Sequence, residues 1–243
     1  MATSPAHATQ SGAETISRMM AKYSAAKTLK GVVEQSTSLV NSKVEVRIDI
    51  QYERSAKKIY VVQNFLTGSR KTLLLISNGK HFAFTAPRRG IKGQEDKTLF
   101  VEPVAGRSST TGEPYVLSFA EIYNAASKSL AMSVAMDIVV GEKTHLDHLK
   151  RQLRQVTGIK PVMEGGELKH WVVSGKWRAR PAGPPTGLYE LWIAPDYTLV
   201  RYRMSEDTAL QGRVHQLVTD EVVKVNINAK PDDKLFRLSK KAG

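Results

Sequence analysis

Hydrophobic and polar residues repeat with two different periods along this chain. In residues 14–26 the apolar side chains recur at intervals of three and four, which predicts an amphipathic helix. The period then changes to two. Residues 32–37 are predicted to form one strand, and residues 44–51 alternate cleanly between apolar and polar side chains, the pattern of an antiparallel strand with one buried face. The chain is therefore expected to open with a helix and to continue as a sheet.

Further strands are predicted at residues 59–66, 71–76 and 80–85. Between the last two stands Asn78-Gly79, a dipeptide typical of tight hairpin turns in which both central residues take a positive φ. Residues 87–114 are rich in Gly, Arg, Lys, Ser and Thr, and this composition predicts a long loop.

The helical period returns in the middle of the chain. Ser118, followed three residues later by Glu121, is a capping-box sequence that predicts the start of a helix. A second apolar segment, residues 130–136, is expected to end near Gly141.

A third helix is predicted to be capped by Thr144 and Asp147 and to be stopped by Gly158 and Pro161. The strand pattern then resumes, at residues 169–177, 188–194, 198–204, 213–219 and 222–228. Because the linkers are short and strands do not alternate with helices, the fold class is mainly β (α+β), one antiparallel sheet with a few helices against it.

The run Leu73-Leu74-Leu75-Ile76 is apolar on both faces of its strand. A sheet with one face in water does not favour this pattern. Either another element covers the second face, or one face lines an apolar cavity that holds a ligand.

The composition excludes some functions. The chain has no cysteine, which excludes disulfides and thiol catalysis, and no run of eighteen apolar residues that would suit a membrane span. The formal net charge of +13 attracts polyanions or anionic lipid, but the basic residues are spread in pairs and not gathered in one run. Diffuse charge of this kind is typical of a solvated surface.

The first residues carry a processing signal that has two interpretations. Ala6-His7-Ala8 matches the small-x-small pattern that precedes a signal-peptidase cut, which favours an exported chain whose signal peptide is removed. The alternative is a plain disordered tail rich in Ala, Ser and Thr. In either case residues 1–12 are expected to lie outside the folded domain.

No catalytic constellation stands out, and no cofactor or metal is expected. His145 and His148 lie three residues apart on a predicted helix, a spacing that can reach one metal, but no matching ligand cluster accompanies them. No nucleophile elbow, phosphate loop or dinucleotide fingerprint is present. The sequence therefore predicts a protein that is not an enzyme.

Four loose motifs, in this order and spacing, resemble the LolA-like family of periplasmic lipoprotein and lipid carriers. They are an arginine-containing strand break at Arg54, the turn Ser77-Asn78-Gly79-Lys80, the strand and turn Leu191-Trp192-Ile193-Ala194-Pro195-Asp196, and an ending in which Asn228 precedes Asp233 and Phe236. The family usually has Asp at the position of Asn78 and Pro at that of Ser55. These departures, the long loop and the high charge indicate a relative of the lipoprotein carrier and not that chaperone itself.

The resemblance implies a strongly curved, incompletely closed antiparallel β-barrel in one domain, residues 13–243. An N-terminal helix and a mid-chain helical lid, about residues 116–157, would accompany it, and Arg54 would latch the lid. The alternative for the apolar side chains is an ordinary filled core. The residues expected to line the cavity or lid are Leu73, Leu75, Phe82, Phe84, Leu130, Met132, Val134, Met136, Ile138 and Trp192.

The function implied is an exported, periplasmic carrier or sensor that shelters acyl chains and takes part in transport toward the outer membrane. The expected ligand is a lipid or lipidated protein, and the expected partners are an anionic membrane surface or a membrane-bound donor or acceptor protein. Nucleic acid is not expected, and the chain is expected to be a monomer. The alternative is a basic interaction module with a filled core that binds a polyanion or a partner protein on its surface.

Overall fold

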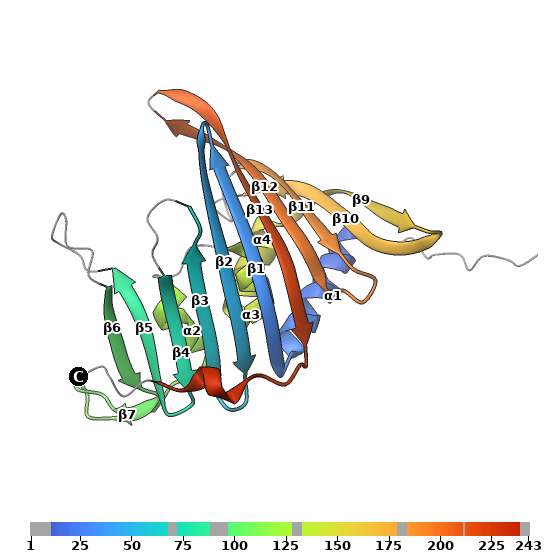
Figure 1. Ribbon diagram of the computed structural model, residues 1–243. Coiled ribbons are helices and arrows are strands. Elements are labelled where there is room, and N and C mark those ends of the chain that lie inside the picture. The colour runs from blue at the N-terminus through green and yellow to red at the C-terminus, as the bar shows by residue number, and fades with distance from the viewer. Residues whose placement is uncertain are drawn as a thin grey trace, which may run out of the picture. The chain divides into compact units, whose positions relative to one another are not determined.

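The computed structural model describes residues 11–67, 72–87, 97–127, 133–178, 184–210 and 212–238 (Figure 1). The chain forms two compact units, each assembled from separate segments. The first contains residues up to Ala25, Thr37–Ser42 and Val134–Val222, and the second contains Ala26–Ser36, Lys43–Ser133 and the residues from Val223 onward. The prediction of a single domain remains a prediction.

The first unit packs three helices with four strands and most of a fifth. Its helices are α1 (Gly12–Ala25), α3 (Val134–Val140) and α4 (Lys143–Gln152). The strands are β9 (Gln155–Glu164), β10 (Glu167–Trp177), β11 (Gly187–Ile193), β12 (Leu199–Leu210) and β13 (Arg213–Ile227), which ends in the second unit. Helix α1 contacts α3, β9 and β10, and α3 contacts α4 and β12, so one face of these strands is covered by helix.

The second unit contains most of β1 (Thr28–Leu39) and β2 (Ser42–Glu53), followed by β3 (Lys58–Phe65), β4 (Thr72–Asn78), β5 (His81–Pro87) and β6 (Lys97–Pro103). A small two-stranded sheet is formed by β7 (Ala105–Arg107) and β8 (Pro114–Val116). Helix α2 (Phe119–Ser127) and a 3-10 turn, η1 (Asp233–Phe236), complete the unit.

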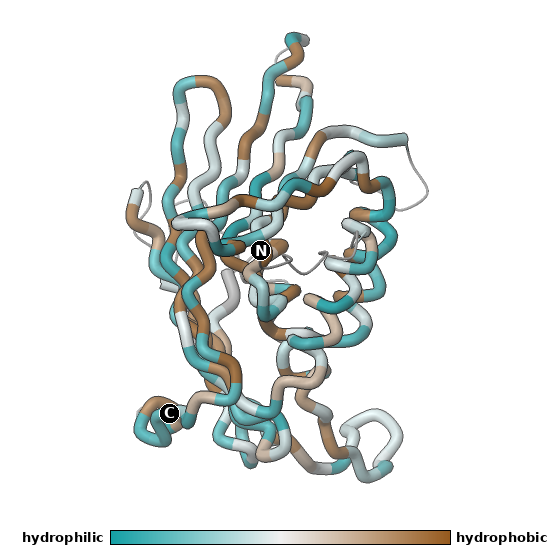
Figure 2. The backbone as a smooth tube through the Cα atoms, turned by 90° about the vertical axis from the view of Figure 1, so that its right-hand side faces the viewer, coloured by the Kyte–Doolittle hydropathy of each residue, from teal (hydrophilic) through white to brown (hydrophobic). Residues whose placement is uncertain are grey.

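The main sheet has eleven strands in the order β6-β5-β4-β3-β2-β1-β13-β12-β11-β10-β9. The end strands β6 and β9 are not neighbours in this order, so the sheet is open. Hydrophobic and hydrophilic positions alternate along its strands (Figure 2), as the period of two requires. The predicted fold class, a mainly β protein with an incompletely closed antiparallel sheet, an N-terminal helix and mid-chain helices, is confirmed. Among the described residues no helix is long and apolar enough to cross a membrane.

The helices largely match their predicted positions, with three differences. Helix α1 begins at Gly12 because the side-chain oxygen of Ser11 accepts a hydrogen bond from the backbone N–H of Glu14. Helix α4 is capped by Glu142, whose carboxylate accepts from the N–H of Thr144 at 2.8 Å, so the prediction that Thr144 itself is the cap is wrong.

The prediction that Gly158 and Pro161 stop this helix is also wrong. The helix ends at Gln152, and both residues lie within β9. Strand β9 is the last strand of the sheet, where a proline is tolerated because one side of the strand needs no backbone donor.

Two strand predictions are also corrected. The stretch 87–114, predicted to be a loop, contains β6 and the small β7–β8 sheet among its described residues. Residues 213–219 and 222–228 are not two strands but the single strand β13.

The hairpin at Asn78-Gly79 is confirmed, but the expected backbone of its turn is wrong. Strand β4 extends through Asn78, so the two central residues are Gly79 and Lys80, and only Gly79 has a positive φ, of 86°. The side-chain oxygen of Asn78 instead accepts hydrogen bonds from the backbone N–H groups of Lys80 and His81, at 2.9 and 2.8 Å. Asparagine thus closes this turn through its side chain, which does not require a left-handed backbone.

Candidate functional site

A row of apolar side chains crosses the second unit from β2 to β6. Residues that face each other across antiparallel strands point to the same side of the sheet. The strand registers pair Ile50 with Val61, Val61 with Leu75, Leu75 with Phe84, and Phe84 with Phe100. These five side chains, which we call the apolar row, therefore form one continuous strip on one face.

The exposure of the apolar row rises along its length. Ile50, Val61 and Leu75 are fully buried, Phe84 is half-buried, and Phe100 on the end strand is 42% exposed. The rings of Phe84 and Phe100 stack with centroids 5.5 Å apart. The strip thus runs from a closed interior to an open edge.

Helix α2 covers the buried part of this face. Its first residue, Phe119, packs on Tyr52 with ring centroids 5.4 Å apart, and the helix contacts β4 and β5. Tyr52 lies two residues from Ile50 on β2 and therefore points to the same side of the sheet. The predicted capping box is present, because the N–H of Ser118 donates to the Glu121 carboxylate at 2.7 Å and the Ser118 hydroxyl accepts from the N–H of Glu121.

Arg54 joins the sheet to the start of α2. Its guanidinium lies 5.0 Å from the ring centre of Phe119 and 5.2 Å from that of Tyr52, and its Nε donates to the carbonyl of Ala26 at 3.1 Å. The interaction with Phe119 is a cation–π contact to the helix. Burial raises the pKa of Tyr52, and the charge of Arg54 opposes that rise. Arg54, which the sequence analysis expects to latch the lid, thus contacts α2 through the ring of Phe119. Its role as a latch stays a prediction.

The C-terminal turn η1 packs against β3 and β4 near one end of these strands, on the face opposite the apolar row (Figure 1). Phe236 is buried there, with the ammonium of Lys58 5.7 Å from its ring centre, and the N–H of Asp232 donates to the side chain of Gln51. The apolar row thus lies on one face of β4, and η1 packs on the other face, where Leu74 and Ile76 are half-buried.

The candidate residues on α3 lie in the first unit and are packed tightly. Met136 and Ile138 are buried and Val134 is half-buried. The N–H of Ala135 donates at 2.7 Å to the carboxylate of Glu221, a fully buried residue of β13. Helix α3 is therefore anchored through its backbone as well as through its side chains.

The other predicted cavity residues are divided between several places. Phe82 is buried beside Phe84, with ring centroids 5.9 Å apart, and Leu73 is half-buried on the face of the apolar row. Trp192 alternates with the buried Leu191, so it points to the opposite face of its strand, where the guanidinium of Arg201 lies 4.9 Å from its ring centre. Leu130 and Met132 lie outside the described residues.

Sequence reasoning missed Ile50, Val61 and Phe100. Both Ile50 and Val61 stand in predicted strands, and cross-strand register pairs Ile50 with Val61 and Val61 with Leu75. Phe100 stands in the apolar triplet Leu99-Phe100-Val101, within the stretch predicted to be a loop. This apolar triplet was the one sequence feature that could have indicated a strand at Phe100.

The histidines do not form a metal site among the described residues, where no group of three or more His, Asp or Glu side chains could hold a metal ion. His145 instead pairs with Asp137, with 3.0 Å between Nδ1 and the carboxylate, so that α4 is tied to α3. The hydrogen bond to Asp137 raises the pKa of His145 above its ordinary value of 6.5.

No family model matches the chain, and no curated protein matches it. Solved structures do. Lipoprotein LppX of Mycobacterium tuberculosis is 10% identical, with 88% of this chain and 93% of that one covered and a TM-score of 0.39. LprF from Mycobacterium bovis is 13% identical, over 91% and 94%, with a TM-score of 0.42.

A LolA superfamily protein from Nitrosomonas europaea is 9% identical, over 92% and 97% of the two chains, with a TM-score of 0.31. The family that the sequence resembles is thus represented among the matching structures. At these identities and TM-scores the likeness does not bear on what this chain binds.

Proposed function

We propose that this protein is a non-enzymatic lipid carrier or sensor that holds an acyl chain along the apolar row, beneath α2. The observation that carries the proposal is the gradient of exposure from the buried Leu75 to Phe100, which is 42% exposed on an end strand. The strip reaches the edge of the sheet, where the rings of Phe84 and Phe100 stack. An acyl chain laid along it would cover the exposed aromatic surface.

Burial of hydrocarbon supplies the affinity. Each methylene group removed from water contributes about 0.8 kcal/mol, so a segment of six methylenes contributes about 5 kcal/mol before the cost of ordering the chain. A carrier needs such modest, reversible binding. Half-buried aromatic rings suit this because they contact methylenes of any chain length without fixed polar anchors.

Helix α2 would serve as the lid over the bound chain. Its contact with the sheet through Phe119, Tyr52 and Arg54 lies at its first residue. Opening would break this contact and would also expose three buried side chains of α2, Phe119, Ile122 and Tyr123, at a cost of several kcal/mol. A bound acyl chain would offset part of this cost by covering the same apolar surface.

The proposed setting follows from the resemblance noted in the sequence. The protein would act outside the cytoplasm, in the periplasm or an equivalent exported compartment, as a monomer. Its cargo would be a lipid or a lipidated protein, exchanged with a membrane surface or a membrane-bound donor or acceptor. Its basic charge of +13 would attract it to anionic membrane, while nucleic acid is not proposed as a partner.

Two neighbouring residues of β6 provide a matched test. Phe100 and Val101 are 42% and 46% exposed and point to opposite faces of the same strand. We would titrate the protein with a fluorescent fatty acid and compare Phe100→Asp with Val101→Asp. The proposal predicts that Phe100→Asp weakens uptake about tenfold or more, since it places a charge against the chain, and that Val101→Asp leaves uptake near the parent value.

Extraction of lipid from protein purified without detergent adds an independent readout. Co-purifying lipid that is lost from Phe100→Asp but kept by Val101→Asp would support the carrier. A bare protein that takes up no fatty acid, or equal losses in both variants, would overturn the proposal. The protein would then be better explained as a basic module with a filled core.

A further inference from the structure

Two hairpin ends of the first unit lie side by side, although they are far apart along the chain. Strand β1 turns into β2 through Val40 and Asn41, and β12 ends at Leu210, just before β13 begins at Arg213. The two ends border one hollow of about 510 Å³, which is lined by Leu39, Val40, Ser42, Leu210, Arg213 and His215. We call residues 39–42, 209–210 and 213–215 the hairpin tips.

The pairing of β1 with β13 explains why the hairpin tips meet. The hydroxyl groups of Thr37 on β1 and Thr219 on β13 lie 3.4 Å apart, so the two strands run together up to the turn at Val40. Beyond Thr37 strand β1 continues for two residues, to Leu39, whereas β13 begins six residues before Thr219, at Arg213. The β12–β13 hairpin therefore extends past the β1–β2 turn (Figure 1).

The hairpin tips expose aliphatic side chains to solvent. Val214 is 73% exposed, the highest value among the large apolar residues of the described chain, while Val40 is 58% and Leu210 43% exposed. Register pairs Val214 with Ala209 and Leu210 with Arg213, so Val214 and Leu210 stand on opposite faces of the β12–β13 hairpin. A protein that packs on one face would cover one of these two side chains, whereas a fluid lipid surface can surround the whole tip.

Val40 occupies its place in the turn at a conformational cost. Its φ of 55° lies in the left-handed region, where a β-branched residue is a steric outlier, and Asn41 does not have a positive φ. A two-residue hairpin turn with a positive φ at its first central position usually has glycine there. Glycine would relieve the strain but would remove the exposed side chain. Strain of this kind is typical of functional positions, which favours a role for the aliphatic group at the tip.

The charge at the hairpin tips is positive. Arg213 and His215 line the hollow, and its lining contains no carboxylate. Arg213 forms no ion pair within the described part of the chain. Along this face of the hairpin the nearest carboxylate belongs to Glu206, about 13 Å from Leu210 on β12. A free guanidinium beside exposed aliphatic groups complements an anionic lipid surface, which offers phosphates above hydrocarbon.

We propose that the hairpin tips are the surface by which this protein docks on an anionic lipid membrane. Val40, Leu210 and Val214 enter the boundary between head groups and acyl chains, and the guanidinium of Arg213 meets lipid phosphates. Arginine suits this boundary, because its methylene stem lies against apolar groups while its charged end stays in water. The inference deepens the proposed function, on which it rests, by naming the surface at which cargo is exchanged.

Site-specific labels test the docking directly. Because the chain has no cysteine, Val214→Cys and Met163→Cys each provide one attachment point for an environment-sensitive fluorophore. Met163 is the apolar control, since it is 51% exposed on β9, four strands from β13 in the sheet order. Phosphatidylcholine vesicles that contain phosphatidylglycerol should shift the emission at position 214 to the blue and leave that at position 163 unchanged. Without phosphatidylglycerol, the half-maximal shift should need at least about fivefold more lipid.

Three variants measure what each group contributes to co-sedimentation with the same vesicles. Val40→Gly, Val214→Ser and Arg213→Gln should each weaken binding about fivefold. Val40→Gly is the most informative, because glycine accepts a positive φ without strain. Its melting temperature should equal or exceed that of the parent, so that its loss of vesicle binding does not reflect unfolding.

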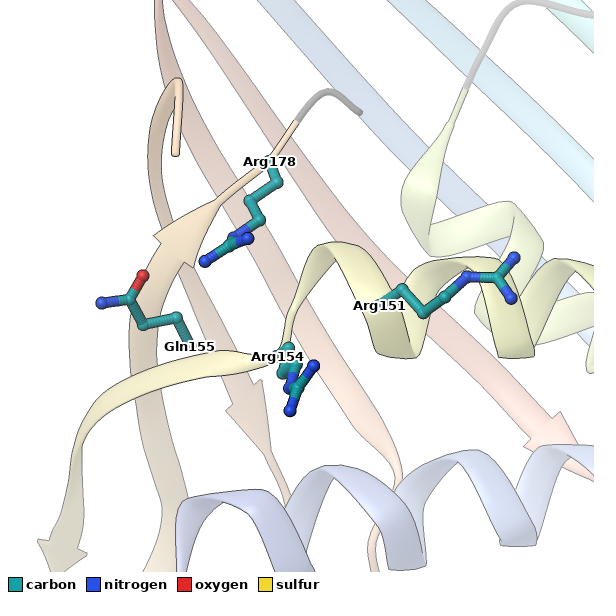
Figure 3. Close-up of a pocket in the computed structure, with 4 residues that line it drawn as sticks. All are labelled: Arg151, Arg154, Gln155 and Arg178. Atoms are coloured by element: carbon teal, nitrogen blue, oxygen red, sulfur yellow. The ribbon is translucent and has the colours of Figure 1, made fainter. Parts of the chain in front are cut away.

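Two control variants change the same kinds of group elsewhere in the first unit. Met163→Ser removes an exposed apolar side chain, and Arg151→Gln removes an exposed positive charge. Figure 3 shows the guanidinium of Arg151 turned away from those of Arg154 and Arg178, so its charge is not part of a convergent cluster. Both controls should bind vesicles within about twofold of the parent.

Uptake of a fluorescent fatty acid in vesicle-free buffer separates this inference from the proposed function. The three tip variants should take up fatty acid like the parent, and Phe100→Asp should still bind vesicles. Normal uptake by a protein that binds no vesicles would overturn the docking surface alone. Normal vesicle binding by a protein that takes up no fatty acid would overturn the carrier alone.

Three results would overturn the docking surface. They are no vesicle binding by the parent, equal losses in the tip variants and the controls, and dimerisation of the parent that replaces vesicle binding and is lost from Val214→Ser. Equal losses would indicate diffuse surface charge. Dimerisation, measured by sedimentation velocity, would assign the hairpin tips to a second copy of the chain.

Discussion

Helices α2 and α3 are held in different ways. At the start of α3 the N–H of Ala135 donates a hydrogen bond to the buried carboxylate of Glu221, and five of the seven residues of α3 are buried. Helix α2 is held at its start by an aromatic contact and by Arg54, and its capping box, Ser118 and Glu121, is exposed to water.

This difference in anchoring indicates which of the two helices could open as a lid. Opening α3 would break a buried polar contact and expose much apolar surface, both of which are costly. Opening α2 would expose three buried side chains, Phe119, Ile122 and Tyr123, against five in α3. Within the lid predicted over residues 116–157 we therefore propose α2 as the part that opens.

The largest expected effect is on the anchor of α3. Glu221→Ala removes the acceptor of the Ala135 N–H inside a fully buried site and should lower the free energy of unfolding by about 3 kcal/mol. Denaturant titration followed by circular dichroism measures it. The matched control is Glu167→Ala at an exposed position, expected to change stability by less than about 0.5 kcal/mol. Equal effects at the two positions would remove the contrast between α3 and α2.

A smaller effect is expected at the start of α2. Arg54→Ala removes the cation–π contact with Phe119 and the hydrogen bond to Ala26, and it should speed amide hydrogen exchange in α2 by about tenfold, with α3 unchanged. Arg54→Lys keeps the charge and loses the planar stack, so an intermediate rate is expected. Exchange measured by mass spectrometry on peptides from the two helices tests the latch. Unchanged exchange in α2 would contradict it.

The smallest effect concerns pH and the pair between α3 and α4. The hydrogen bond to Asp137 raises the pKa of His145 in the folded state above 6.5. A raised pKa means that protonation favours folding, so the pair's contribution is complete below pH 6.5 and is lost as pH rises through the folded-state value. Asp137→Asn should therefore destabilise the protein by at most about 1 kcal/mol at pH 6 and by less at pH 9. A cost that grows with pH would reverse this assignment.

Much of the fold could be predicted because one period dominates each segment. The alternation in residues 44–51 and the capping box at Ser118 each have one structural interpretation, and both are found. The third helix was extended too far because Gly158 and Pro161 were interpreted as helix stops. Both residues instead lie in β9, an end strand of the sheet, which tolerates them. Local signals do not report where a strand lies in its sheet.

The candidate site was less predictable, for a different reason. Leu75 and Phe84 were expected from the apolar run and the family resemblance, but the apolar row is a property of register among five strands. Phe100 follows a stretch with a loop-like composition, so its pairing with Phe84 had no local signature.

The most direct test of the central claim is photo-crosslinking with a diazirine-labelled fatty acid, followed by peptide mapping. The account predicts labels on β5, on β6 at Phe100, and on α2, all removed by an excess of unlabelled fatty acid. Labels that fall on α3 or α4, or that persist under competition, would contradict an acyl-chain site along the apolar row.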